Sequence, residues 1–214
     1  MQIIKYICTL FGFLTLGACS NVKLALYDNQ KRQEYALETK KAFSNSETGK
    51  EIALKSSVIE TAKKYVGTRY KYGSIDPKQG FDCSGLVYYV AKKQDIVLPR
   101  SSSSMGAAAP HIPWKKANPG DLIFFGDRGS IHHVGIVEKN KEGELWVIHS
   151  TNQRGVIEEN VLISAYWKKR ILFAVDFSTL HQKYKNTKSW VLASNPLFYF
   201  KPYLFIRIAR MIIN

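Results

Sequence analysis

The chain has 214 residues, 45% of them hydrophobic and 13% aromatic, which is enough apolar material for one sizeable folded domain. Its 31 Lys and Arg against 17 Asp and Glu give a formal charge of +14, which attracts polyanions in general: nucleic acids, anionic lipids or anionic wall polymers. The three cysteines lie far apart without a CxxC pair, and no GxxxxGK[ST] or GxGxxG loop occurs, which excludes the zinc-finger and nucleotide-loop classes. We expect no metal and no cofactor.

Residues 1–18 have the composition of a secretory signal. One Lys is followed by an apolar run from Ile7 to Leu16, and the stretch contains no acidic residue. The run is too short to cross a bilayer comfortably as a helix, which takes about 20 residues. The alternative is a buried N-terminal helix, and the signal is favoured over it.

The run ends in residues 16–19, Leu-Gly-Ala-Cys, which resemble the lipobox of bacterial lipoproteins. The resemblance implies that Cys19 is lipidated and becomes the new N-terminus. Ser20 resembles a sorting signal for the outer membrane, where the protein would face the periplasm. Cys8 leaves with the signal, so Cys83 remains as the free thiol of an exported chain. An anionic membrane surface then suits the basic charge, and we expect no nucleic-acid partner.

Residues 19–54 are rich in polar and charged side chains with little apolar periodicity, which predicts a tether with a short helix near residues 30–39. From Ser56 the pattern becomes helical. Ser56 or Ser57 can cap this helix, and Gly67 can end it.

The folded domain is predicted over residues 55–177. A second helix opens at Cys83, and strand-like runs separated by turn signals follow at residues 121–125, 132–138, 144–150, 155–159 and 170–176. Helices first and strands second indicate an α+β fold, with N-terminal helices packed on an antiparallel sheet of about five or six strands. We expect a monomer.

Residues 178–214 combine basic and aromatic side chains and form a C-terminal extension. Docking on the domain is favoured over contact with an anionic membrane.

Cys83 stands at the predicted first turn of its helix, after Asp82 and before Ser84-Gly85. Free backbone N–H groups at that position stabilise a thiolate, so we expect the pKa of Cys83 to be lowered. The same groups can receive the oxyanion of a tetrahedral intermediate. The alternative is a buried structural cysteine.

A nucleophile of this kind needs a base, and His132 and His133 are adjacent in a predicted strand. Neighbours in a strand point to opposite sides, so only one of them can face the Cys83 helix. His149 lies on the strand predicted to pair with theirs and can orient the base. Each histidine can also be read as a satisfied core residue, but two strand histidines together with a helix-start cysteine weigh against that.

Four segments, residues 81–87, 98–101, 119–125 and 133–137, resemble the NlpC-type cell-wall peptidases in order and spacing, and the resemblance covers residues 56–176. It implies a reduced papain-like fold with Cys83 as nucleophile, His133 as base and His149 as the orienting residue, which leaves His132 as an outward neighbour.

The resemblance further implies that Tyr70 contributes its hydroxyl near the oxyanion site, with Ser84 and Asp82 beside it. Asp82 is read more readily as a structural acceptor for the loop than as a catalytic group. Arg100 and Ser101 either line a groove for anionic peptides or form a simple connection. Residues 73–74 are Gly-Ser where the family often has Gly-Gly, a departure that concerns the substrate groove.

The substrate that the resemblance implies is the peptidoglycan stem peptide, commonly cut between D-γ-glutamate and the diamino acid. Residue chemistry alone supports an amide or ester. Two other readings stay open: an envelope-binding scaffold lipoprotein with weak or no activity, and an acyl hydrolase or transferase with a different substrate.

Overall fold

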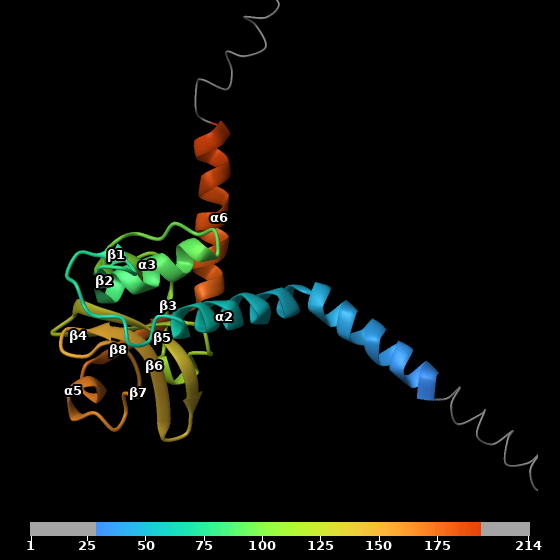
Figure 1. Ribbon diagram of the computed structural model, residues 1–214, viewed down its shortest axis with the longest axis horizontal. Coiled ribbons are helices and arrows are strands. Elements are labelled where there is room, and N and C mark those ends of the chain that lie inside the picture. The colour runs from blue at the N-terminus through green and yellow to red at the C-terminus, as the bar shows by residue number, and fades with distance from the viewer. Residues whose placement is uncertain (1–28, 194–214) are drawn as a thin grey trace, which may run out of the picture. The chain divides into compact units, whose positions relative to one another are not determined.

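The structure, a computed structural model, describes the backbone of residues 29–193 and the side chains of residues 29–185 (Figure 1). The predicted signal, the predicted lipidation site Cys19 and residues 194–214 of the predicted extension lie outside the described residues. Over residues 29–193, none of the helices has both the length and the apolar character needed to cross a bilayer.

The chain divides into two units, residues 1–50 and 51–214. In the first, residues 29–45 are helical, and helix α2 (Glu47–Lys63) begins after Ser46. The Ser46 hydroxyl accepts a hydrogen bond from the Gly49 N–H at 3.0 Å, as a helix cap does. The predicted start at Ser56 or Ser57 is therefore wrong, because the helix is already capped nine or more residues earlier; the short helix predicted near residues 30–39 is likewise longer.

The second unit is built on a six-stranded sheet in which every pair of neighbours is antiparallel. The α+β prediction is thereby confirmed. The strands are, in spatial order, β3 (His111–Ile112), β8 (Ile171–Val175), β4 (Leu122–Asp127), β5 (Ser130–Lys141), β6 (Glu144–Thr151) and β7 (Gly155–Asn160).

Helices cover both faces of this sheet. Figure 1 shows α3 on one side of it and α5 beyond the other side. The remaining elements are α3 (Cys83–Lys93), α4 (Ser102–Gly106), η1 (Trp114–Lys116), α5 (Ala165–Lys168), α6 (Phe177–Ala193) and a small ribbon of β1 (Ile75–Asp76) and β2 (Gly80–Phe81).

Two apolar clusters fill the space on the two sides of the sheet. The first joins the sheet to α2, α3, α4 and α6 through buried side chains that include Leu86, Val90, Phe124, Ile136 and Leu180. The second joins the opposite face to η1 and α5 through side chains that include Ile123, Phe125, Val147, Trp114 and Trp167. Strand residues alternate between the clusters, as the period of a strand requires.

A buried lysine ties three segments of the second unit together. Lys55 is 6% exposed, and its Nζ lies 2.9 Å from Asp121, 3.0 Å from Glu51 and 3.1 Å from Asp176. Burial alone would lower the pKa of Lys55, but the three carboxylates raise it, so the ammonium stays charged. The cluster holds α2 against the start of β4 and the end of β8.

The C-terminal extension begins as part of the domain. Asp176 accepts a hydrogen bond from the Ser178 N–H at 2.7 Å at the start of α6, and Leu180 is fully buried. Lys183 Nζ donates to the carbonyl of Ala108 at 2.7 Å. The first turns of residues 178–214 therefore pack on the domain.

Candidate active site

Cys83 is the first residue of α3, and the residue before it caps the helix. An oxygen of Asp82 accepts from the Gly85 N–H at 2.6 Å, and the other accepts from the Gly73 N–H at 2.8 Å. A Cβ at position 85 would lie 2.1 Å from the carbonyl oxygen of Ser74, so only glycine fits there. The Asp82 contacts and Gly85 therefore define a tight loop, and the thiol of Cys83 at its end is partly exposed.

The side chains of Asp82 and Ser84 are held by Arg100. Arg100 contacts both Asp82 oxygens, at 3.0 and 2.7 Å, and Nη1 donates to the Ser84 hydroxyl at 2.9 Å. Asp82 and Ser84 are each 6% exposed. These contacts hold the loop around Cys83 in place, and they engage the guanidinium of Arg100.

The surroundings of the Cys83 sulfur raise its pKa. Burial is the largest cause; the charge of Asp82 acts in the same direction, while the backbone N–H groups of Val134, of Ser84 and of Cys83 itself lower it. The expectation of a lowered pKa is therefore wrong, because desolvation of the thiolate outweighs the helix-start N–H groups. The influence of the Val134 N–H also locates the sulfur beside β5, next to His133 in the chain.

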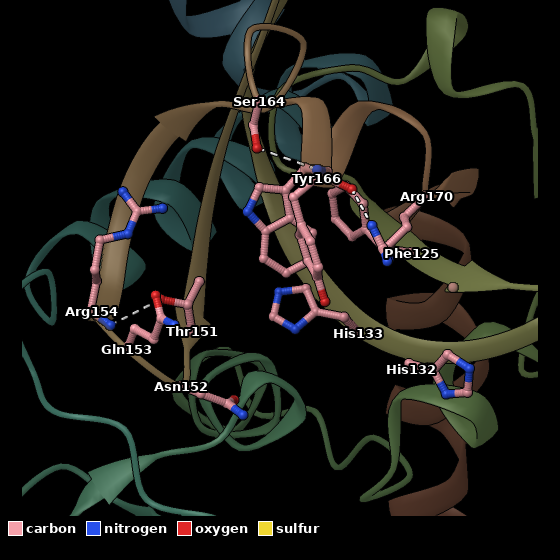
Figure 2. Close-up of a pocket in the computed structure, with 12 residues that line it drawn as sticks. Phe125, His132, His133, Thr151, Asn152, Gln153, Arg154, Ser164, Tyr166 and Arg170 are labelled. Carbon is pink, nitrogen blue, oxygen red and sulfur yellow. Dashed lines mark hydrogen bonds between the residues drawn. The ribbon is translucent and has the colours of Figure 1, made fainter.

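A bulge in β5 separates the two adjacent histidines. Phe125 pairs with His133, but the next residue, Gly126, pairs with Ile131, so His132 is the extra residue. His132 is exposed, whereas His133 is partly buried. Figure 2 draws them well apart, with His133 among the pocket residues and His132 to one side.

His133 and His149 are joined directly. His133 Nε2 lies 2.9 Å from His149 Nδ1, with the ring planes 73° apart. Burial is the main cause that lowers the pKa of each imidazole, and of His133 strongly. No hydrogen bond joins Cys83 to His133 among the described residues, and the His149 contact leaves His133 Nδ1 as the nitrogen free for the thiol.

Gly135 lets the two histidine strands come close. A Cβ at this position would lie 2.4 Å from Val147 Cγ1 and 3.1 Å from His149 Cβ. The glycine of the His133-Val134-Gly135 segment therefore has a packing role, which is to leave room for His149 on β6.

Glu159 on β7, which is not among the site residues predicted from the sequence, extends the histidine pair. Its Oε1 lies 2.9 Å from His149 Nε2 and accepts from Trp167 Nε1 at 2.9 Å. Both of its oxygens accept from Arg154 Nη2 at 2.7 Å. The hydrogen bond with His149 is the largest cause that lowers the pKa of Glu159, to about 2. An acid on the strand after His149 is the sequence signal that points to it.

Trp167, also missed from sequence, packs on the imidazoles. Its ring lies 4.6 Å from that of His133 in a stacked arrangement and 4.9 Å from that of His149. It lines an open pocket of about 600 Å³ together with His133, Arg154 and Arg170, and Figure 2 shows the two arginines on opposite sides of the pocket. Cys83 is not among the lining residues.

Tyr70 lies near the nucleophile. Burial raises the pKa of Tyr70, and the negative charges of Cys83 and Asp82 raise it further. The backbone of Tyr70 also pairs with that of Phe81, two residues before Cys83. Over the described part of the chain, no group of three or more His, Cys, Asp or Glu side chains is placed to hold a metal ion.

A sequence profile described as the NlpC/P60 family matches residues 67–176. Two relatives are from Bacillus subtilis (strain 168): the gamma-DL-glutamyl hydrolase, 36% identical over 129 residues, and the bifunctional muramidase/DL-endopeptidase CwlT, 38% identical over 119 residues. These matches cover 60% and 54% of this chain but 30% and 34% of the relatives, so the chain spans about a third of their length. A solved structure of an NlpC/P60 family protein from Bacillus cereus ATCC 10987 has a TM-score of 0.50 and 28% identity, over 56% of this chain and 39% of that one.

Proposed function

The chain belongs to the NlpC/P60 family, and we propose that it is a cysteine peptidase that hydrolyses amide bonds in the stem peptides of peptidoglycan. One observation carries the proposal: Cys83 opens α3 beside β5, where His133 is held at 2.9 Å by His149. A thiol, a base and a group that orients the base are the parts that thiol acyl transfer needs.

The first step is general-base catalysis by a neutral pair. Burial is the main cause that raises the pKa of Cys83 and lowers that of His133, so the resting protein has a neutral thiol and a neutral imidazole at neutral pH. His133 Nδ1 takes the thiol proton as the sulfur attacks the amide carbonyl carbon and the C=O π electrons move onto the oxygen.

The second half of the cycle uses the same imidazole as an acid and then as a base. His133 gives its proton to the amine nitrogen as the C–N bond breaks, which leaves a thioester on Cys83. His133 then takes a proton from water as the water oxygen attacks the thioester carbon. The C–S bond breaks, the peptide acid is released, and the Cys83 sulfur takes the proton back from His133 to become a thiol again.

The backbone N–H groups at the start of α3 and the Tyr70 hydroxyl are suited to hold the oxyanion. The N–H groups of Cys83 and Ser84 already act on the sulfur, and the same groups can reach an oxygen on the carbon that it attacks. Burial raises the pKa of Tyr70 further above neutral pH, so the phenol is protonated and can donate a hydrogen bond.

The pocket beside His133 suits the leaving group. The amine that leaves must take its proton from His133, so it has to lie beside this imidazole. The pocket lies beside the imidazole of His133, and Cys83 is not among its lining residues. Arg154 and Arg170 give the pocket cationic walls that match the carboxylates of a stem peptide.

We further propose that the bond cut joins D-γ-glutamate to the diamino acid. The names of the two Bacillus subtilis relatives, a gamma-DL-glutamyl hydrolase and a DL-endopeptidase, support this choice.

We propose that the protein works in the cell envelope as a lipoprotein at the outer membrane. The signal-like residues 1–18 and the lipobox-like segment ending in Cys19 support this location. Metabolic labelling of the expressed chain with a palmitate analogue tests it: label should enter the parent chain and be lost in Cys19→Ala. Label that persists in that variant would refute the site.

The decisive experiment incubates the full chain, and its Cys83→Ser variant as control, with purified peptidoglycan. Mass spectrometry of the soluble products should show stem peptides ending in D-γ-glutamate with the parent protein and none with the variant. A folded, thiol-reactive protein that releases no fragments contradicts the proposal. Retained binding to peptidoglycan without cleavage would favour a scaffold lipoprotein.

A further inference from the structure

Glu159 lies at the end of a line of hydrogen bonds that runs across three strands. His133 on β5 contacts His149 on β6, and His149 contacts Glu159 on β7, each over 2.9 Å. The register explains the line: Glu159 pairs with Val147 and His149 with Ile157, so the acid and the imidazole are diagonal neighbours on one face of the sheet.

The donors around Glu159 fix its role as an acceptor. Arg154 from the β6–β7 turn and Trp167 from α5 both donate to its carboxylate, and neither can accept a hydrogen bond. The carboxylate is thus ionised and held in place, and it can only accept from the third neighbour, His149.

This arrangement determines where both imidazoles carry their protons. His149 must donate from Nε2 to Glu159, so a neutral His149 has no proton on Nδ1. His149 Nδ1 must then accept from His133 Nε2. A neutral His133 with its proton on Nε2 has its lone pair on Nδ1, which is the form that can take a proton from Cys83.

We propose that Glu159 is a positioning residue of this active site, which selects the tautomer of His149 and, through it, that of His133. The proposal rests on the peptidase function proposed above and adds a fourth member to the Cys83–His133–His149 set. It also assigns Glu159 a second effect: its charge stabilises the imidazolium that His133 becomes when it takes the thiol proton.

The kinetic test replaces Glu159 by Gln in the full chain. A glutamine amide can present its NH₂ to His149 and carries no charge. We therefore expect kcat on peptidoglycan fragments to fall on the order of 10–100-fold, which is the size of loss given for outer partners of metal-bound histidines. KM should change little. The acid limb of the kcat/KM profile should move to lower pH, because the imidazolium of His133 loses the stabilising charge. The charged groups that act on His133 are His149 and Glu159, and Arg154 acts in turn on His149.

Two controls separate positioning from folding. Glu159→Asp keeps the carboxylate and should recover part of kcat. Glu158→Gln changes the neighbouring acid of the same strand, which pairs with Lys63, and should leave kcat and the pH profile unchanged. Equal losses in Glu159→Gln, Glu159→Asp and Glu158→Gln would overturn the proposal, as would an unchanged kcat in Glu159→Gln.

Nitrogen-15 NMR of the imidazole rings tests the tautomers without any substrate. The parent chain should show both His133 and His149 protonated at Nε2, and Glu159→Gln should change the His149 pattern while Glu158→Gln does not. A His133 proton on Nδ1 in the parent chain would overturn the inference. Correct tautomers in a protein that does not cut peptidoglycan would instead contradict the proposed function and leave the positioning role standing.

Discussion

Arg100 holds both carboxylate oxygens of Asp82, at 3.0 and 2.7 Å, from a position 18 residues further along the chain. The contact joins the loop after α3 to the residue that caps α3. Residues 81–87 and 98–101 are separate segments of the sequence. The contact between Arg100 and Asp82 joins them, and together they set the position of Cys83.

Arg100→Ala should loosen this loop. It removes the cation from a largely buried carboxylate, which keeps the hydrogen bonds from the Gly73 and Gly85 N–H groups, and loss of a hydrogen bond to a charged group costs about 1.5–3 kcal/mol. Urea unfolding should show a loss in that range, and kcat should fall because the helix start that holds Cys83 moves. Arg100→Lys should recover little, since an ammonium cannot contact both oxygens in the same way. Full activity in Arg100→Ala would show that the pair does not position the thiol.

Lys55→Ala should be strongly destabilising. The change leaves Asp121, which is fully buried, without its ion-pair partner, and breaking a buried pair costs about 3–5 kcal/mol. The matched control is Lys50→Ala on the same helix, whose pair with Glu47 is exposed and should cost less than about 1 kcal/mol. Urea titrations of the two variants measure their free energies of unfolding. Similar losses in both would contradict the conclusion that Lys55 stabilises the contact between α2 and the sheet.

Stability should fall as the pH drops below about 6.5. Burial lowers the pKa of His133 and His149 in the folded protein, so the unfolded chain takes up protons first and is favoured as the pH falls. Glu159, with a pKa lowered to about 2, contributes only at more acidic pH, when the unfolded carboxyl begins to protonate below about 4.5. Urea unfolding between about pH 8 and pH 5 measures the histidine effect, and His133→Asn should reduce the slope. A slope of opposite sign would contradict the buried neutral pair.

Arg170→Gln should weaken substrate binding with little effect on the chemical step. Arg170 lines the pocket beside His133 and contacts neither Cys83 nor the histidine pair; it lies over the Tyr166 ring at 3.8 Å. Loss of this cation should raise KM for anionic stem peptides and leave kcat nearly unchanged. Arg128→Gln, an exposed arginine outside the pocket, serves as the control. An unchanged KM would show that stem peptides do not use this wall.

The sequence is sufficient for the antiparallel sheet and for a cysteine at the start of a helix, because alternation in strands and helix-start signals are local patterns. The choice of His133 over His132 rests on the family resemblance, and the catalytic roles of Cys83, His133 and His149 stay predictions. The start of α2 was misplaced because Ser46 and Ser56 are equally good caps by composition, and only the structure shows that the Ser46 hydroxyl makes the capping hydrogen bond.

The direction of the Cys83 pKa and the role of Glu159 were not predictable, because both depend on packing between distant segments. Burial of the sulfur comes from the approach of β5 to α3, and Glu159 meets His149 only through the register of β6 and β7. Trp167 joins them from α5, a helix of four residues that no sequence pattern had indicated.

Gly135→Ala tests whether the spacing of the histidine strands matters for activity. The added Cβ would lie 2.4 Å from Val147 Cγ1, and overpacking of this kind costs about 1–3 kcal/mol. It would also press on His149, whose Cβ would be 3.1 Å away, so kcat should fall along with stability. Val147→Ala removes the closest contact, so the double variant should recover stability relative to Gly135→Ala. Recovery of kcat in the double variant would assign the loss to the Val147 clash, whereas a persistent loss would assign it to displacement of His149; full activity in Gly135→Ala would contradict both.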